Sequence, residues 1–485
     1  MWKRKAGLIA FAALLAGSPS VHAAESKPVN AEPKITAGYQ YSIQVEEDGT
    51  VWSFGKQLGS MFASQVGRQS GGVLDHVVQA GGGYAHAAAV DDEGRVWAWG
   101  ENDKGQLGQG DIEPYAAAVQ VPFEGGTRIE AVAVGYDHTL ALSEKGNVWA
   151  WGGNRYGQLG DGTETDRSKP VRVMDGLRPM RDAVAVAAGF GYSLALNEDG
   201  EVWTWGSQGK ADGDVRQVML NKGGRLIPLN DIVAISAGYD HSIALDRSGK
   251  LYVWGVNRDG QLGLGSGTLY SLDAVELTGL PAMKAIAAGE RSSAAVDETG
   301  NLWVWGVGVA GPSKNASGET VRFEPERITD GGHFATVSVG RDHGVATDDE
   351  ERIWVWGRND NGQLGHGYRS FATSKPVVKN ELQREYASAS FSTVAVEETF
   401  VRDNQYVVKL NLQLKDAAGK MLYGKWPTAE WKMNGREPTV AAFALAKEGG
   451  YRAEIGIPYP YYIIPQKIEV RVDGTTIAEL TIEKH

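Results

Sequence analysis

One stretch of the chain decides its fold: Gly135–Leu142 (GYDHTLAL), followed by Lys145–Gly152 (KGNVWAWG) and Gly157–Gly160 (GQLG). It predicts a strand, a tight turn, a second strand and a loop. The same pattern returns along most of the sequence, and the glycine after its aromatic residue stands at Gly55, Gly100, Gly152, Gly206, Gly255, Gly306 and Gly357. Copies with a period of about 50 residues and strand-like content indicate a radial or linear array of small sheets.

Tryptophan marks the same place in these copies. Twelve of the 15 tryptophans lie in the seven copies, most of them as a Trp-x-Trp-Gly pair. A large ring that recurs at one place in a repeat is best explained as a wedge that packs one unit against the next. Burial of such a ring stabilises the folded chain by roughly 2–3 kcal/mol.

A single copy divides into four short strands, as residues 169–206 illustrate. The expected strands are a Pro-led edge strand at Lys169–Val173, then Ala183–Ala188, Ser193–Leu196 and Glu201–Trp205. A hairpin turn, Asp199-Gly200, precedes the last of them. Four antiparallel strands repeated seven times predict an all-β protein with a seven-bladed β-propeller at residues 35–379.

The two ends of the repeat region predict a closed ring. The first copy starts at Ile35 and lacks the Pro-led strand, whereas the last copy ends with Pro376–Val378 and has no copy after it. A missing strand at one end and a surplus strand at the other would let both termini share one blade. Closure removes the exposed sheet edges that an open array would leave. A linear solenoid is the alternative.

The repeat resembles that of the regulator of chromosome condensation family. The pattern Ala-Gly-x-x-His-Ser/Thr-x-Ala-Leu, then Gly-x-Val-Trp-x-Trp-Gly-x-Asn-x-x-Gly-Gln-Leu-Gly, is fullest at Gly135–Gly160 and Gly238–Gly263, and close forms run Gly83–Gly108 and Gly340–Gly365. The resemblance implies a seven-bladed propeller whose loops contribute to partner binding. One family member is the nucleotide-exchange factor for the GTPase Ran and binds chromatin. Others are secreted bacterial propellers that inhibit β-lactamases through aromatic loops on one face.

The N-terminus predicts export. Lys3-Arg4-Lys5, the apolar run Leu8–Ala16 and Val21-His22-Ala23 match the three parts of a secretory signal peptide at residues 1–23. Residues 24–34 are expected to form a flexible lead. We expect a secreted or cell-surface protein without membrane insertion after signal removal, because no second apolar run is long enough to span a bilayer. The net charge of −12 argues against a nucleic-acid partner.

A second domain is expected after the repeats. Residues 380–389 are polar and predict a linker, and residues 390–485 contain runs of alternating polar and apolar residues. The expected strands are Val408–Lys415, Thr439–Leu445, Tyr451–Ile457, Lys467–Val472 and Thr476–Ile482. About 100 residues of such strands fit a β-sandwich. The segment Leu410–Leu422 resembles the opening of bacterial immunoglobulin-like domains of the invasin type, which implies spacing or adhesion at a cell surface.

The most informative candidate position follows the first glycine of each copy. Its residues are Tyr39, Tyr84, Tyr136, Phe190, Tyr239, Glu290 and Arg341, and Asp137, Asp240 and Asp342 follow three of them. Equivalent loops of a propeller lie on one face around the axis, so five aromatic rings and an arginine would surround it. Aromatic residues and arginine dominate the energetics of protein interfaces. The alternative is that the rings pack on one another at the channel mouth.

Other recurring polar residues favour structural roles. One repeat position carries His86, His138, His241 and His343, but Tyr41, Tyr192 and Ser292 in copies one, four and six. This mixture does not suit a metal cage, and we expect each histidine to bond backbone in its own blade. The loop asparagines before Gly-Gln-Leu-Gly are expected to serve turn geometry.

No sequence pattern predicts an enzyme or a cofactor. The chain has no cysteine, and it lacks Gly-x-Ser-x-Gly, phosphate-loop, HExxH and zinc patterns. The loop Asp161–Asp166 hints at a cation site, but its spacing does not fit an EF-hand. We expect a secreted, non-enzymatic propeller that binds a protein partner through one loop face, as an inhibitor or an adhesion module. The alternatives are a structural or glycan-binding component of the cell envelope, a β-lactamase-inhibitor-like protein, and an enzyme with its site in the central channel.

Overall fold

The computed structural model describes residues 34–56, 64–207, 214–307, 313–314, 320–329, 331–365 and 370–378, and the strands of a C-terminal unit between 393 and 482. The predicted signal peptide, linker and all of the lead except Lys34 lie outside the described residues. Two compact units are distinguished, one made of residues 1–365 and 369–379 and the other of residues 366–368 and 380–485.

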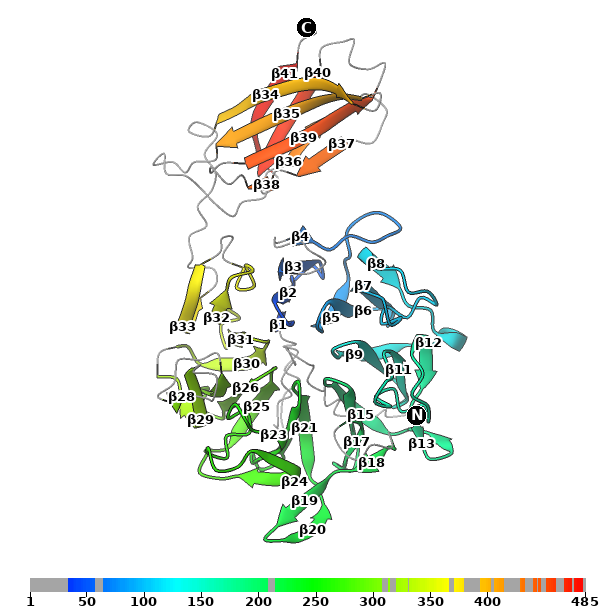
Figure 1. The fold of residues 1–485 in the computed structure, drawn as a ribbon, viewed down its shortest axis with the longest axis vertical. Helices are drawn as coiled ribbons and strands as arrows, with labels where there is room; N and C mark the ends of the chain where they lie inside the picture. The colour runs from blue at the N-terminus through cyan, green and yellow to red at the C-terminus, as the bar shows by residue number, and fades with distance from the viewer. Residues whose placement is uncertain are drawn as a thin grey trace, which may run out of the picture. The chain divides into compact units, whose positions relative to one another are not determined.

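Seven antiparallel sheets build the first unit, one for each copy, and Figure 1 shows them arranged radially with β1, β5, β9, β15 and β21 nearest the centre. From the innermost strand outward, the first three blades are β1 (Ile35–Ala37), β2 (Tyr41–Val45), β3 (Val51–Gly55) and β4 (Ser64–Gln65); β5 (Val77–Gly82), β6 (His86–Asp91), β7 (Val96–Gly100) and β8 (Tyr115–Gln120); and β9 (Ile129–Val134), β10 (His138–Ser143), β11 (Val148–Gly152) and β12 (Arg167–Arg172). Blades four and five are β15 (Ala183–Ala188), β16 (Tyr192–Asn197), β17 (Val202–Gly206) and β18 (Arg216–Gln217); and β21 (Ile232–Ala237), β22 (His241–Asp246), β23 (Leu251–Val256) and β24 (Tyr270–Leu277). Blades six and seven are β25 (Met283–Ala288), β26 (Ser292–Asp297), β27 (Leu302–Val307) and β29 (Thr320–Arg327); and β30 (Phe334–Val339), β31 (His343–Asp348), β32 (Ile353–Asn359) and β33 (Ser370–Val378).

Short elements are added to this frame. The hairpin of β19 (Met219–Lys222) and β20 (Arg225–Pro228) extends blade five through a parallel pairing with β24. Blade six gains β28 (Ser313–Lys314) beside β29. The hairpin of β13 (Met174–Asp175) and β14 (Arg178–Pro179) and the one-turn helix η1 (Glu124–Gly126) occupy connections between blades.

The phase of the repeat differs from the predicted one. The Pro-led strand β12 pairs with β11, where Trp149 lies opposite Arg172, so it completes blade three and does not open blade four. Each blade therefore begins with its innermost strand, and the first copy lacks nothing. The described sheets also correct the prediction of one blade shared by both termini, because β1–β4 form one sheet and β30–β33 another.

Blades one and seven are joined by hydrogen bonds between sheets. The backbone N–H of Ala37 donates to Ser338 Oγ at 2.9 Å, and Ser42 Oγ donates to the carbonyl of Gln363 at 2.7 Å. The first and last copies thus meet as two complete blades.

The two tryptophans of each pair have different roles. The second ring is the predicted wedge: Trp151 and Trp205 are fully buried, and their Nε1–H groups donate to the carbonyls of Gln106 and Gln158 in the preceding blade at 2.9 and 2.8 Å. The first ring bonds within its own blade at three positions, where Trp97, Trp303 and Trp354 donate Nε1–H to Asp91, Asp297 and Asp348 at 2.9, 2.9 and 2.8 Å.

The recurring histidines lock neighbouring blades together. Nε2 of His138 lies 3.0 Å from Ser193 Oγ of the next blade, and that hydroxyl donates to the carbonyl of Gln158 at 2.8 Å. Because the hydroxyl proton goes to the carbonyl, the imidazole must donate through Nε2–H. Nε2 of His86, His241 and His343 meets the hydroxyls of Thr139, Ser293 and Ser42 at 2.9, 2.8 and 3.1 Å. The sequence predicts a structural role for these histidines, but the predicted hydrogen-bond partner is wrong. Each histidine bonds a hydroxyl group of the next blade and not the backbone of its own blade.

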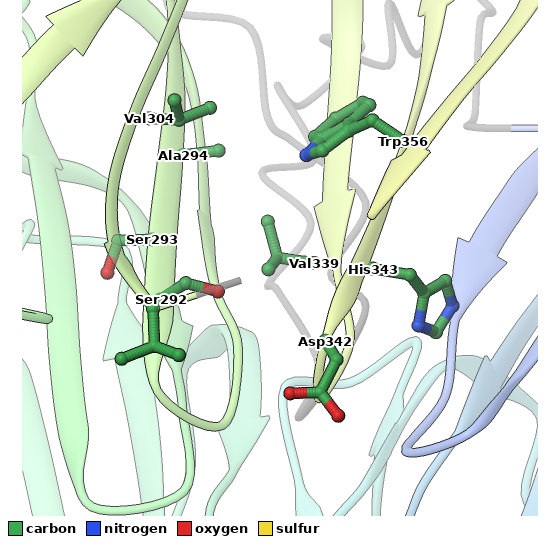
Figure 2. A pocket seen from close by; sticks show the side chains of 9 residues that line it. Ser292, Ser293, Ala294, Val304, Val339, Asp342, His343 and Trp356 are labelled. Atoms are coloured by element: carbon green, nitrogen blue, oxygen red, sulfur yellow. The ribbon is translucent and has the colours of Figure 1, made fainter. Parts of the chain in front are cut away.

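Three junctions between blades depart from this arrangement. Tyr41 and Tyr192 donate their hydroxyls to the carbonyls of His86 and His241 in the next blade, at 2.7 and 2.6 Å. Ser292 is too short to do the same. A cavity of about 10 Å³ lies between blades six and seven. Ser292, Asp342 and His343 are among the residues that line it (Figure 2).

The C-terminal unit consists of two four-stranded antiparallel sheets. One has the order β34 (Thr393–Arg402), β35 (Gln405–Gln413), β39 (Tyr451–Pro458), β38 (Ala444–Leu445), and the other β37 (Thr439–Ala442), β36 (Thr428–Trp431), β40 (Gln466–Val472), β41 (Thr475–Ile482). Four of the five expected strands correspond to β35, β39, β40 and β41. The expected strand Thr439–Leu445 is instead divided into β37 and β38, which belong to different sheets, and β34 and β36 were not predicted. Leu410 and Leu412 are fully buried, as their alternation in β35 predicts. The sandwich and the immunoglobulin-like assignment stay predictions.

Candidate functional site

The predicted candidate residues lie together around the propeller axis. In an up-and-down sheet, the turn after the first strand and the loop after the third lie at the same end. We call this end of the seven blades the axial face; it contains the turns at residues 38–40, 83–85, 135–137, 189–191, 238–240, 289–291 and 340–342. Backbone bonds connect the turns: Phe190 N–H donates to Tyr239 O at 3.0 Å and Arg341 N–H to Tyr39 O at 3.2 Å.

Five aromatic rings form an arc on this face. The ring centroids of neighbours lie 4.5 Å apart for Tyr39 and Tyr84, 4.2 Å for Tyr84 and Tyr136, 4.7 Å for Tyr136 and Phe190, and 4.3 Å for Phe190 and Tyr239. The rings therefore pack on one another, as the alternative interpretation predicts. All five are nevertheless only half-buried, so the arc also offers aromatic surface to solvent.

Charged residues complete the ring at blades six and seven. Arg341 Nε lies 3.3 Å from Glu290 Oε2 and 3.3 Å from Asp342 Oδ2, and its guanidinium carbon lies 4.9 Å from the Tyr39 ring centre. Burial raises the pKa of Glu290 to about 7, although the Arg341 charge opposes the shift. Burial and the nearby Glu290 raise the pKa of Tyr39 to about 12. The carboxyl group of Glu290 thus changes protonation near neutral pH.

The aspartates beside the ring fall into two groups. Asp342 is close to two arginines, with Arg358 Nη1 3.4 Å from its Oδ2 in addition to Arg341. Asp137 and Asp240 instead accept a neutral amide: Gln158 and Gln261 donate Nε2–H to them at 3.2 Å. Burial raises the pKa of Asp240 to about 6 and that of Asp137 above its usual range.

Sequence reasoning missed the loop residues that support this face. Gln158 and Gln261 each stand 21 residues after the aspartate they bond, so Tyr-Asp-His followed by Gly-Gln-Leu-Gly was the available signal. Arg291 pairs with Asp259 of blade five, with Nε and Oδ2 2.7 Å apart. Tyr156 lies 6.0 Å from the Phe190 ring. These contacts fix the inner turns to the outer loops.

In the loop Asp161–Asp166, considered above as a cation site, the Asp161 carboxylate already accepts hydrogen bonds from neighbouring side chains. Asp161 Oδ2 accepts from Arg167 Nε at 2.7 Å, and its Oδ1 accepts from Asn154 Nδ2 at 3.1 Å. Across the part of the chain that the structure describes, no group of three or more His, Cys, Asp or Glu residues could hold a metal ion. Within the same residues, no helix is long and apolar enough to cross a membrane.

The hydrogen bonds between adjacent blades and the axial face define a seven-bladed propeller in which one recurring unit is bonded to the next. The chain belongs to the RCC1-like domain family, whose model matches residues 57–396. It is 35% identical over 272 residues to the ultraviolet-B receptor UVR8 of Arabidopsis thaliana, covering 55% of this chain and 49% of the receptor. It is 30% identical over 289 residues to the mouse secretion-regulating guanine nucleotide exchange factor, covering 58% and 51%. The chain spans about half or less of the curated relatives it matches.

Solved structures agree on the fold. Prp20p of Saccharomyces cerevisiae is 25% identical with a TM-score of 0.54, over 63% of this chain and 77% of Prp20p. Human WBSCR16 is 22% identical with a TM-score of 0.55, over 69% of this chain and 86% of that structure. The family resemblance predicted from the repeats is therefore confirmed, and so is the seven-bladed propeller.

Proposed function

We propose that this protein binds a protein partner through its axial face and acts without catalysis. The observation that carries the proposal is the ring itself: five half-buried aromatic residues and an arginine brought together from six of the seven blades. Stacked rings held by their neighbours lose little side-chain freedom on binding, so they favour affinity. Tyrosine and arginine are also the residue types that concentrate binding energy in interfaces.

The comparisons support a binding role. The Prp20p structure is described together with that protein's binding to Gsp1p and histones. The relatives with known roles include a receptor and a guanine nucleotide exchange factor. Binding of another protein, as described for Prp20p, fits the axial face of this chain.

Affinity capture with the axial face altered tests the proposal. The protein lacking residues 1–23 would be immobilised and used to capture proteins from the extracellular fraction of its host. We expect Tyr136→Ala with Tyr239→Ala to lower capture at least tenfold. Leu177→Ala is the matched control, because Leu177 is an apolar residue 98% exposed on the β13–β14 hairpin at the opposite end of the blades.

Two results would contradict the proposal. Equal capture by the double variant and the control would place binding elsewhere. If the protein accelerated a reaction of the captured partner, such as nucleotide exchange on a GTPase, the proposal that it acts without catalysis would be contradicted. Circular dichroism of both variants checks that each is folded.

We further propose that the protein is exported, with the C-terminal strands as an immunoglobulin-like spacer or adhesion domain. The basic, apolar and small-residue parts of residues 1–23 support export. N-terminal sequencing of the protein from the culture medium should begin at Ala24. An intact Met1 on the cellular protein would contradict export.

A further inference from the structure

One arginine side chain, that of Arg341, already lies on the axial face. The residues around it show which contacts a guanidinium group makes there. The Arg341 guanidinium lies over the Tyr39 ring at 4.9 Å, with carboxylate oxygens of Glu290 and Asp342 each 3.3 Å from Nε. A planar guanidinium favours this combination, because it stacks on an aromatic face while its N–H groups meet carboxylates.

A tyrosine and an aspartate also stand next to each other in the turns of blades three and five, where the aspartate has no ion pair with a lysine or arginine among the described residues. Tyr136 is followed by Asp137 and Tyr239 by Asp240, and the two tyrosine rings lie 6.0 Å apart, edge to face, with Phe190 packed against both. Among the described residues, no lysine or arginine forms an ion pair with Asp137 or Asp240; each accepts a glutamine amide instead. A partly buried carboxylate without an ion pair is unfavourable, so these two positions would gain from a cation supplied from outside.

The charges around Asp137 also favour a positive group, whereas those around Asp240 oppose each other. The pKa of Asp137 is raised by burial and further by the charges of Asp166 and Asp103. At blade five Arg258 and Asp259 have opposite effects on the pKa of Asp240, and Asp259 is already paired with Arg291. Asp103 and Asp166 therefore add negative charge near Asp137, which attracts an incoming cation.

We propose that Asp137 and Asp240 are two subsites for arginine side chains of a protein partner, with each guanidinium placed against the neighbouring tyrosine ring. The inference rests on the proposed function, and it specifies the partner: a protein surface with two exposed arginines flanking an apolar contact over Phe190. Blade four supplies no third subsite, because Gly191 occupies the aspartate position there.

A small-molecule titration tests the subsites without knowledge of the partner. N-acetyl-arginine amide and its neutral isostere N-acetyl-citrulline amide would be titrated into the mature protein and followed by NMR. We expect the arginine amide to bind at least fivefold more tightly. Asp137→Asn with Asp240→Asn should abolish this preference while keeping the glutamine bonds, and Glu93→Gln, at an exposed turn of the opposite face, should leave it intact. Equal binding of the two amides, or a preference that survives the double variant, would overturn the proposal.

A captured partner separates this inference from the proposed function. If Tyr136→Ala with Tyr239→Ala abolishes capture but Asp137→Asn with Asp240→Asn leaves it unchanged, the protein-binding face stands and the arginine subsites do not. If no partner is captured, the amide titration still decides on the subsites. Light scattering covers a further case, because self-association lost in the aspartate double variant would make the occupant a second copy of this chain and contradict a foreign partner.

Discussion

Glu290 makes the axial face sensitive to pH near neutrality. Its pKa is about 7, against an ordinary value of 4.5, because burial disfavours the charged carboxylate. A carboxyl group whose pKa is raised by folding stabilises the folded state fully below pH 4.5, and this contribution is lost as the pH rises through about 7. The stability of the protein at this position therefore falls between those two pH values.

The substitution Glu290→Gln isolates that contribution. Relative to this variant, the wild-type protein should lose stability as the pH rises from about 4.5 to about 7.5, because only the wild type must bury a charge. Urea unfolding midpoints of both proteins at several pH values in this range measure the difference. A difference that stays constant with pH would mean that the carboxyl group of Glu290 does not titrate in this window.

Individual residues were predictable where the repeat identified equivalent positions. The ring from Tyr39 to Arg341 follows from one rule, the residue after the first glycine, and the structure brings all seven together. The partner of His138 was not predictable, because reaching Ser193 depends on the angle between adjacent blades. Periodicity shows which residues correspond, but it does not show which neighbour each side chain faces.

At the scale of elements, each junction between blades is a separate bonded unit. The lock of His138 combines a buried imidazole, the Ser193 hydroxyl and the Gln158 carbonyl, which also accepts the Trp205 N–H. Burial lowers the pKa of His138 to about 3, so the ring is neutral at physiological pH and acts as a hydrogen-bond donor. The junction between blades six and seven has Ser292 at this position and a small cavity beside it.

His138→Ala and Ser292→Ala should therefore differ although they alter the same repeat position. We expect His138→Ala to cost about 2–4 kcal/mol, from the lost hydrogen bond and the cavity left in a packed junction. Ser292→Ala should cost under about 1 kcal/mol, because no side-chain bond of Ser292 is present among the described residues. Chemical unfolding of the two variants gives both values, and equal costs would contradict the role of the histidine lock.

The strands themselves were largely predictable, and the grouping of strands into blades was not. Alternation and turn residues located β15, β16 and β17 within a residue or two of their observed bounds. The Pro-led strand β12 was assigned to the wrong blade because an extended segment between two sheets can pair with either neighbour. The β19–β20 hairpin was missed, since its pairing with β24 joins residues about 50 positions apart.

At the scale of the whole molecule, the chain consists of two units that do not share a described sheet. All strands from β1 to β33 pair within the first unit, and all strands from β34 to β41 pair within the second. Cooperative unfolding requires stabilising contacts that are lost together. Because no described sheet contains strands of both units, we expect two separate unfolding transitions for the full chain.

Removing residues 380–485 tests this independence. Calorimetry of the full chain should show two transitions, and the shortened chain should keep one of them with its midpoint shifted by less than about 2 °C, which corresponds to under about 1 kcal/mol for a unit of this size. The arginine-amide titration should be unchanged, because each residue of the axial face lies before Lys379. A single transition in the full chain, or a midpoint lowered by about 10 °C on shortening, would mean that the two units stabilise each other. In that case the C-terminal strands would be part of the scaffold that holds the axial face.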